Sequence, residues 1–534
     1  PMSSLYGSDA MGGVINVITK KASSDTWKGS ITPEYTKSVN DYSNDNYGTS
    51  MFLTGPLIKD KVSLSLDGSF QGTDESDYVG GEGQKSGSSE SEKKVRKIGS
   101  ELTWNVDENN DLGLRYDFTR QEYKTTLGKS VNVSSQASTN ENEKDAYTVS
   151  HKAKYNDFIL NTYYQDETTK KVYDLGGTDE KKEELKTFNT QGSFFIGTHA
   201  LTVGGQYQKE KIIDTTNGLA SITGVTELDR WLMSLYAEDE WSITNNFALT
   251  AGARYNKDEY FGSEVTPRIY GVYHITDSLT LKGGVSTGYK QPTISQISEG
   301  FGSRTGKGSA VIIGNSDLKP EKSISYEAGV NYSNEDIGLF SSLMFYQSDF
   351  KDKIVESRLC DSPGTNNNSP QALWQCSANG KPYRFVSQME NVDNAEMKGI
   401  EFSLDYDLVE NLTASTSYTY TKTEQKSGDF KGQALNKMPK DMINAGLDWD
   451  ISKVWNAWTQ YNYRGKTSDY LSRTSMSSGT PGYGTFDAGV VYKATKDLSL
   501  KAGIYNIANK EITNGDYEIV LDGRRYTIGM NMRF

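Results

Sequence analysis

Apolar and polar side chains alternate along many short segments of this chain. In the last segment, Tyr526, Ile528, Met530, Met532 and Phe534 are separated by Thr527, Gly529, Asn531 and Arg533. Period-two alternation gives a β-strand one apolar face and one polar face. The pattern recurs at residues 112–119, 247–254 and 498–504. Such strands are expected in a barrel whose outside meets lipid and whose inside meets water.

Two kinds of connection separate these segments. Short polar turns lie at 59–61, 108–111, 244–246, 276–278 and 495–497, and long polar loops lie at 72–94, 124–144, 291–322, 355–390 and 466–481. In a transmembrane barrel the short turns face the periplasm and the long loops face outside. Counting the segments from Trp27 to Phe534 gives about 22 strands, an even number as in single-chain outer-membrane barrels.

The composition fits strands that hide their apolar half by alternation. Mean hydropathy is -0.65, and no run approaches the ~18 apolar residues that a membrane helix needs. The 34 Tyr, 18 Phe and 8 Trp suit aromatic girdles at the membrane interfaces. Among them, Trp104, Trp241, Trp449 and Trp455 lie beside short turns. A soluble propeller or solenoid, the alternative, would show a fixed-period repeat that is not seen here. We therefore predict an all-β, antiparallel transmembrane β-barrel.

Charge and motif content narrow the function. A net charge of -13 and a pI near 5.0 argue against nucleic acid as a partner. No Ser-His-Asp constellation, Gly-rich phosphate loop or Cys/His metal spacing is visible, which argues against an enzyme, a metal site and a permanently bound cofactor.

The two cysteines, Cys360 and Cys376, lie in one polar segment. Two Cys in one loop predict a loop-closing disulfide in an oxidising compartment such as the periplasm or cell surface. The alternative is a pair of unrelated thiols.

A barrel of about 22 strands has a lumen wide enough for a whole domain and needs a plug. The first residues fit that role, because the stretch from Leu5 to Lys21 is Gly-rich and then β-branched. Its nearly continuous apolar run, residues 14–18, is typical of a strand buried on both faces. We predict that residues 1–24 are the C-terminal part of a plug and that residues 25–534 form the barrel.

Several motifs carry a family resemblance. The stretch Tyr6-Gly-Ser-Asp-Ala-Met-Gly-Gly-Val-Ile15 resembles the end of the plug of TonB-dependent outer-membrane receptors. Barrel motifs similar to that family are 266–270, 282–292, 315–321, 391–401 and 522–526. Among these receptors, the chain looks most like the catecholate siderophore group that includes the colicin I and ferric-enterobactin receptors.

The resemblance implies a bacterial outer-membrane protein that actively imports a ferric siderophore of catecholate type. The implied partners are the TonB-ExbB-ExbD complex, outer-membrane lipid and lipopolysaccharide, and, as a secondary role, a colicin or phage. Most of the plug, including the segment offered to TonB, is expected to be missing from this chain.

A ferric tris-catecholate is a triply negative, flat-faced anion, so its site needs cations and aromatic rings. Two long loops offer both. The candidate ligand-binding residues are Arg304, Lys307, Arg358, Lys381, Tyr383, Arg384 and Phe385.

Three other functions remain as alternatives. A haem receptor commonly presents His from its surface, but His151, His199 and His274 lie in a strand or at short turns rather than in long outer loops. A cobalamin receptor is harder to separate from a siderophore receptor. A passive large-pore channel is disfavoured by the plug-like N-terminal stretch.

Overall fold

The structure is a computed structural model of the 534-residue chain. It describes residues 7–8, 10–11, 13–14, 22–77, 91–130, 137–173, 179–392, 394–428, 430–435, 437–471 and 476–534. Most of the plug-like stretch, residues 1–6, 9, 12 and 15–21, therefore lies outside the described residues.

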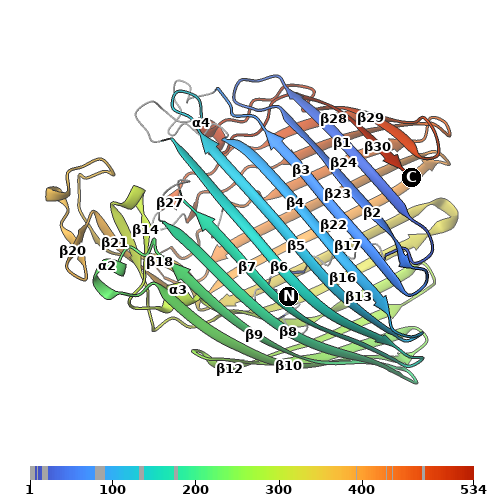
Figure 1. Cartoon of the computed structure of the whole chain (residues 1–534), viewed down its shortest axis with the longest axis horizontal. Coiled ribbons are helices and arrows are strands. Elements are labelled where there is room, and N and C mark those ends of the chain that lie inside the picture. Colours follow the sequence, from blue (N-terminus) through green and yellow to red (C-terminus); the bar gives the residue numbers. More distant parts are fainter. Residues whose placement is uncertain are drawn as a thin grey trace.

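Twenty-two strands form one antiparallel sheet that closes on itself (Figure 1). The first eleven are β1 (Lys28–Ser38), β2 (Asn46–Ile58), β3 (Val62–Thr73), β4 (Glu92–Asn105), β5 (Asn110–Thr125), β6 (Ser138–Lys154), β7 (Phe158–Val172), β8 (Glu180–Ile196), β9 (His199–Asp214), β10 (Glu227–Thr244) and β11 (Phe247–Asp258). The others are β12 (Gly262–His274), β13 (Leu279–Lys290), β16 (Glu321–Asn334), β17 (Leu339–Lys351), β22 (Ala395–Val409), β23 (Leu412–Gln425), β24 (Asp441–Trp449), β25 (Trp455–Arg464), β28 (Tyr483–Lys493), β29 (Leu498–Tyr505) and β30 (Arg525–Arg533).

The last strand closes the barrel against the first. β30 pairs with β1 on one side and with β29 on the other. On the inner face, the hydroxyl groups of Thr36 and Thr527 lie 2.7 Å apart in a hydrogen bond. On the outer face, Ile528 is 62% exposed and Phe534 66%. The predicted barrel and the predicted alternation of the terminal strand are confirmed.

The two ends of the barrel differ as the sequence predicts. We call them the short-turn end, with connections such as 59–61, 197–198 and 245–246, and the loop end. Trp104, Trp241, Trp449 and Trp455 are exposed near the short-turn end, each between 42% and 46%. A belt of aromatic side chains therefore marks this rim, as at a membrane interface.

Three connections depart from the prediction. The loop expected at 124–144 is shorter, because β5 continues to Thr125 and β6 begins at Ser138. The segment expected as a loop at 355–390 contains strands of its own. One loop-end connection, at 259–261, is a tight turn. Above a membrane both faces of a strand are wet, so the apolar alternation used to find strands disappears there.

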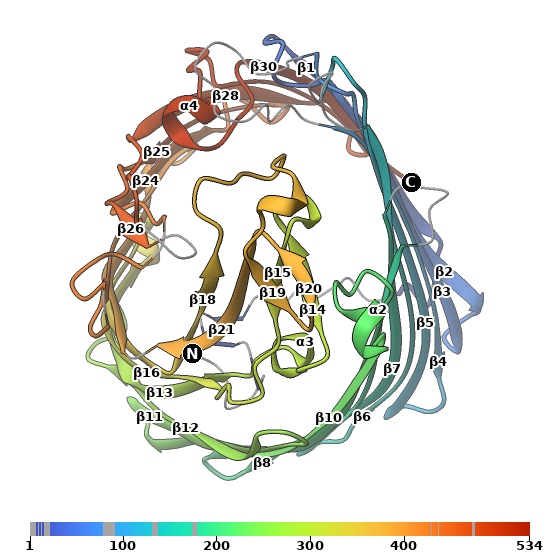
Figure 2. The same ribbon diagram turned by 90° about the vertical axis from the view of Figure 1, so that its left-hand side faces the viewer.

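Connections 215–226, 291–320 and 352–392 fold together at the loop end, and we call them the loop body. It contains α2 (Ala220–Thr223), α3 (Ile294–Ile297), β14 (Gly302–Thr305), η1 (Gly306–Gly308), β15 (Ala310–Ile313), β18 (Lys353–Asp361), η3 (Gln371–Leu373), β19 (Cys376–Ala378), β20 (Lys381–Tyr383) and β21 (Phe385–Val392). A four-stranded sheet of order β14-β15-β21-β18 and the hairpin β19–β20 are its core elements. Figure 2 shows the loop body within the outline of the barrel, across its opening.

Short elements complete the described structure. η2 (Glu335–Ile337) is a short-turn connection, and β26 (Tyr470–Leu471), β27 (Met476–Ser477) and α4 (Asn514–Tyr517) lie in loop-end connections. Within the described part of the chain, no helix is long and apolar enough to cross a membrane.

Candidate functional site

The loop body is held together by side chains from different connections. Asn217 donates to the backbone oxygens of Val225 (2.6 Å) and Gly300 (3.1 Å), and its own oxygen accepts from the Gly302 backbone (2.8 Å). The Gly218 backbone donates to the Gly302 carbonyl at 2.7 Å. The connection that carries α2 is thereby fixed to the start of β14.

Two of the family-like motifs meet in this body. Asn315 donates to the Met389 carbonyl at 2.8 Å. Asn391 accepts from the Lys319 backbone at 2.7 Å and donates to the carbonyls of Lys319 and Asp352. An Asn side chain offers donors and an acceptor together, which lets it bridge two backbones. These motif residues therefore fix the two long connections to each other.

The disulfide of Cys360 and Cys376 joins β18 to β19. Cys376 belongs to a buried apolar cluster with Leu219, Val311 and Tyr383. The loop body thus has a small core of its own, separate from the barrel wall.

Two arginines lie against one aromatic ring beside this core. The guanidinium of Arg358 is 3.5 Å from the centroid of the Phe385 ring, and that of Arg384 is 4.6 Å from it. Both distances are within the range of cation–π attraction. Neither arginine makes an ion pair with a carboxylate of the described residues. The arrangement concentrates two positive charges and can bind an anion.

Unsatisfied donors strengthen this interpretation. Arg358 Nη1 and Arg384 Nε are buried, and neither has a hydrogen-bond partner among the residues that the structure describes. A buried N–H without a partner is costly, more so when it belongs to a cation. An oxyanion can supply the acceptors only when the loop body moves, because both atoms are inaccessible in this structure.

The two aromatic residues that were predicted to contact the ligand are buried inside the loop body and do not lie on its surface. Phe385 is only 6% exposed and Tyr383 only 2%, so neither ring is open for stacking. The Tyr383 hydroxyl donates to the Gly218 carbonyl at 3.0 Å, and Lys381 Nζ donates to the same oxygen at 3.4 Å. Burial raises the pKa of Tyr383, and the charge of Arg304 acts in the opposite direction. The phenol therefore stays protonated and able to donate.

The other two predicted cations lie apart. Arg304 is on β14, two strands from β21 in the sheet. Its side chain is 46% exposed, and its guanidinium is 4.0 Å from a carboxylate oxygen of Asp179. Lys307 is in η1, and its side chain lies outside the described residues. The sequence also missed Trp374, a half-buried ring inside the disulfide loop.

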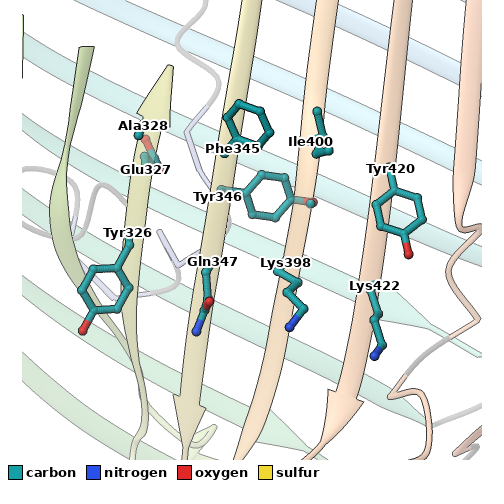
Figure 3. Close-up of a pocket in the computed structure, with 11 residues that line it drawn as sticks. Tyr326, Glu327, Ala328, Phe345, Tyr346, Gln347, Lys398, Ile400, Tyr420 and Lys422 are labelled. Atoms are coloured by element: carbon teal, nitrogen blue, oxygen red, sulfur yellow. The ribbon is translucent and has the colours of Figure 1, made fainter. Parts of the chain in front are cut away.

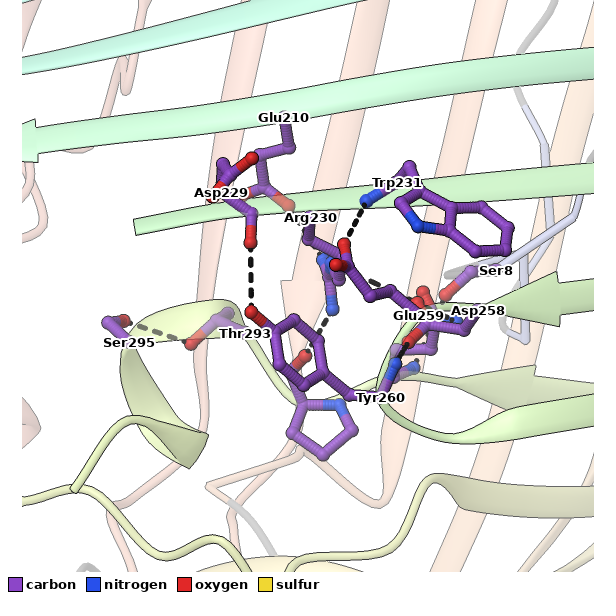
Figure 4. Close-up of polar contacts among 12 residues, drawn as sticks. Ser8, Glu210, Asp229, Arg230, Trp231, Asp258, Glu259, Tyr260, Thr293 and Ser295 are labelled. Atoms are coloured by element: carbon purple, nitrogen blue, oxygen red, sulfur yellow. Dashed lines mark hydrogen bonds and ion pairs between the residues drawn. The ribbon is translucent and has the colours of Figure 1, made fainter. Parts of the chain in front are cut away.

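Below the loop body, the inner wall carries a polar cluster that sequence reasoning missed (Figure 4). Arg230 donates to Glu210 Oε2 at 2.7 Å and to the Pro292 carbonyl at 2.9 Å. Asp258 accepts from the Gln291 side chain at 2.7 Å, and Arg230 Nε lies 3.9 Å from the same carboxylate. The cluster ties strands β9, β10 and β11 to the connection that leads into the loop body. Gln291 belongs to the family-like motif 282–292, and this motif was the signal in the sequence that could have pointed to the cluster.

Asp258 also shapes the tight turn at 259–261. Its Oδ1 accepts from the backbone N–H groups of Tyr260 (2.7 Å) and Phe261 (3.1 Å). An Asp that bonds the backbone two residues later stabilises a turn without a loop. Tyr260 then reaches across to the Asp229 carbonyl at 3.1 Å (Figure 4).

The described N-terminal residues contact the same inner wall. Ser8 Oγ accepts from the Gln291 backbone at 3.3 Å. The Gly7 backbone, at a φ of +85°, lies so close to Arg254 that an added Cβ would be 3.1 Å from its guanidinium. Arg254, 1% exposed, donates to Gln206 at 2.6 Å. Because Arg254 points into the lumen, this part of the chain lies inside the barrel.

Two observations bear on bound metals. Among the described residues, no group of three or more His, Cys, Asp and Glu side chains is arranged to hold a metal ion. His199 Nδ1 forms a hydrogen bond of 2.7 Å with Asp239 Oδ2, and the His199 ring stacks on Trp241. Both contacts are at the short-turn end, so this histidine is engaged far from the loop body.

Comparison with known proteins agrees with this architecture. The family described as "TonB dependent receptor-like, beta-barrel" matches residues 100–507. The iron-regulated outer membrane virulence protein of Vibrio cholerae is 34% identical over 100% of this chain and 78% of its own length. The ferric enterobactin receptor of Pseudomonas aeruginosa is 26% identical over 96% and 75%.

A solved structure shows the same fold. The siderophore receptor PirA of Acinetobacter baumannii superposes with a TM-score of 0.83, at 22% identity, over 99% of this chain and 84% of that one. The barrel, the motifs and the family match together identify an outer-membrane protein, so the loop end faces the cell exterior. The chain belongs to the TonB-dependent outer-membrane receptors.

Proposed function

We propose that this receptor imports a ferric siderophore of the catecholate type, which is cargo rather than a resident cofactor. The observation that carries the proposal is the pair Arg358 and Arg384 on the Phe385 ring, at the outer opening of the barrel. TonB dependence follows from membership of the family. The proposed ligand class depends instead on the chemistry of the arginine pair.

The arginine pair suits a multiply charged, oxygen-rich anion. Guanidinium groups are weakly hydrated and present several donors in a plane, so they bind oxyanions directionally. Two of them fixed on one ring repel each other until an anion neutralises them. A ferric tris-catecholate brings three negative charges and six phenolate oxygens, whereas a neutral hydroxamate complex brings no net charge to relieve that repulsion.

The structure also supports a route from the loop body to the lumen. The connection 291–320, which carries α3 and Arg304, begins at Gln291. Gln291 contacts both Asp258 on the wall and Ser8 of the N-terminal segment. Movement of the loop body on ligand binding would therefore reach the chain inside the barrel through one residue. We assign residues 1–24 to the plug on this basis.

The names of the relatives favour a siderophore over haem and cobalamin as the ligand. The Pseudomonas relative is named for ferric enterobactin, and a vitamin B12 transporter of Photobacterium profundum is also similar, at 23% identity. For haem, the three His positions at strands and short turns offer no axial ligand near the loop body. Docking of a colicin or phage stays a prediction from family resemblance.

The test is a binding titration followed by tryptophan fluorescence. We expect Arg358→Ala plus Arg384→Ala to weaken ferric-catecholate binding about 100-fold, because each hydrogen bond to a charged group is worth ~1.5–3 kcal/mol. The matched control is Arg96→Ala, which removes an exposed arginine from the outer face of β4 and should bind like the unmodified receptor.

The same titration with ferric hydroxamate, haem and cobalamin separates the alternatives. Tight binding of haem or cobalamin, with weak binding of ferric catecholate, would overturn the proposed ligand class. An unchanged catecholate curve for the double variant would overturn the proposed site.

A further inference from the structure

A groove of about 500 Å³ on the outer wall of the barrel belongs to the surface that faces lipid (Figure 3). It lies across β16, β17, β22 and β23. Tyr326 in its lining follows Ser325, which is buried on the inner face, so Tyr326 points outward. Tyr326 and Phe345 are 46% and 50% exposed. Exposed apolar side chains are expected on a membrane-facing wall, so this groove indicates no further function.

A second pocket, of about 440 Å³, lies at the short-turn end, which faces the periplasm. It is formed where the connections 450–454 and 494–497 meet the last residues of β30. The backbone N–H of Lys493 donates to the Val454 carbonyl at 2.8 Å, and that of Arg533 donates to the Asp497 carbonyl at 2.8 Å. The walls of the pocket are therefore fixed to one another by backbone hydrogen bonds.

Strand register places much of the pocket on the inner face of the barrel. Thr527, whose hydroxyl bonds across to β1, is on that face, and Asn531 and Arg533 follow it at even spacing along β30. Asn531 is opposite Ser499, and Ser499 is opposite Lys493, so these three residues form one inward row. The pocket therefore opens toward the mouth of the barrel and not toward lipid.

The pocket carries a surplus of positive charge. Its cations are Lys453, Lys493, Lys496 and Arg533. The one carboxylate in the lining, that of Asp497, lies 3.9 Å from Lys496 Nζ. Among the residues that the structure describes, no carboxylate forms an ion pair with the other three cations. Arg533 Nε donates instead to the neutral side chain of Asn531 at 3.2 Å.

The lining also has an apolar part. Its apolar residues are Val454, Val491, Ala494 and Leu498. The methylene stems of the lysines add to this surface, because Lys keeps only its head in water. The pocket therefore suits carboxylates that are carried on short apolar groups, as they are in Asp and Glu side chains.

The positive charge continues along one side of the periplasmic rim. The short-turn connections that contain Lys or Arg are 59–61, 450–454 and 494–497. Neither residue type occurs in the other short-turn connections of the described chain, 106–109, 155–157, 197–198, 245–246, 275–278, 335–338 and 410–411. Because β30 pairs with β1, the positive connections are neighbours around the rim (Figure 1). From β25 to β2 they span roughly 24 Å, five strand spacings of ~4.8 Å, which is wider than a small anion.

We propose that this pocket and the positive rim beside it bind an acidic segment of a soluble periplasmic protein. Carboxylates of the segment contact Lys453, Lys493 and Arg533, and its side-chain methylene groups pack on the apolar lining. Opposite charge guides such a partner to the rim. The surface is separate from the N-terminal segment that the resemblance assigns to TonB, and it lies at the mouth from which imported cargo leaves the barrel.

The test is fluorescence anisotropy of a labelled peptide of six Glu-Ala repeats, titrated with the purified, detergent-solubilised receptor. We expect saturable binding at low ionic strength. Lys453→Gln plus Lys493→Gln should weaken it at least fivefold, because two charge pairs with the peptide are lost. Ser499→Trp fills the pocket without changing its charge and should also weaken binding. Heat-dependent gel mobility shows that each variant still forms the barrel.

The matched control, Lys152→Gln plus Lys154→Gln, removes the same charge from the short-turn end of β6, away from the positive side of the rim. It should bind the peptide like the unmodified receptor. Equal affinity in the unmodified receptor and the pocket variants, or equal binding of a peptide of Gln-Ala repeats, would overturn the inference. Displacement of the peptide by an equal concentration of inorganic phosphate would reveal a small-anion site and overturn the assignment to a protein segment. Ferric-catecholate titration of the same variants, which we expect to be unchanged, keeps this result separate from the proposed function.

Discussion

At the scale of single residues, the proposed anion site depends on one buried ring. Phe385 was a candidate for stacking on the ligand, but at 6% exposure its ring instead supports the guanidinium groups of Arg358 and Arg384. Its contribution to binding is therefore indirect, through the position of the two cations.

Replacement of that ring tests the distinction. Phe385→Leu keeps an apolar side chain of similar size but removes the cation–π attraction, worth about 1–2 kcal/mol at a desolvated site. We expect ferric-catecholate affinity to fall about tenfold, while the thermal unfolding of the receptor changes little. Phe385→Tyr should restore binding. Equal affinity for the Leu variant and the unmodified receptor would argue against a shared platform.

Residue type and neighbourhood in the sequence did not show how the candidate residues are used in the fold. Lys381 and Tyr383 stand beside Arg384 in sequence, yet both bond the Gly218 carbonyl. Because side chains alternate along an extended segment, neighbours in sequence face different surroundings. Only the folded hairpin shows which of them is held by the Gly218 carbonyl.

At the scale of elements, Glu75 links two exterior connections outside the membrane-spanning strands. Its carboxylate accepts from the Ser130 hydroxyl and from the Thr126 backbone N–H. Burial acts to raise the pKa of Glu75, but these hydrogen bonds outweigh it and hold the pKa below the ordinary value of 4.5. The ionised form is the one that holds the connections together.

A pH dependence follows from the direction of this shift. Because the folded-state pKa is lowered, the stabilisation is present above about pH 4.5 and is lost as pH falls through the lowered pKa. Spin labels at positions 77 and 127 should report a narrow distance distribution at pH 7 that broadens once pH falls below the lowered pKa. Labelling Asp77 also removes its ion pair with Lys129, so that pair cannot cause the change.

Glu75→Gln is the control for the pH experiment. Its neutral amide should give the broad distribution at both pH values. A distribution that stays narrow throughout an acid titration of the unmodified sequence would contradict the role of the Glu75 carboxylate.

At the scale of the whole molecule, the barrel and the loop body are stabilised differently. The barrel closes through strand pairing between β1 and β30. The loop body has its own apolar cluster and the Cys360–Cys376 disulfide. Loss of the disulfide should therefore loosen the site and leave the barrel intact.

The prediction is tested with Cys360→Ser plus Cys376→Ser. The sequence separation is 16, and the chain-entropy model gives ~3 kcal/mol for closing a loop of this size. We expect the heat-dependent gel mobility of the barrel to be unchanged and ferric-catecholate affinity to fall about tenfold. The unmodified receptor in reducing agent should show the same loss. Reduced barrel stability in the variant would contradict the separation of the two parts.

The sequence by itself determined the barrel, because a strand between lipid and water must alternate apolar and polar side chains, and that alternation is local. It determined the membrane, the alternation of short and long connections, and the terminal strand that ends at Phe534. It could not determine the exterior part, where strands are wet on both faces.

Tertiary structure alone decided how the long connections fold together. It brought Arg358 and Arg384, 26 positions apart in the numbering, onto one ring, and it joined Gln291 to Ser8 through contacts between distant segments. Such sites depend on pairing between segments far apart in the chain, which has no local signature in the order of the residues.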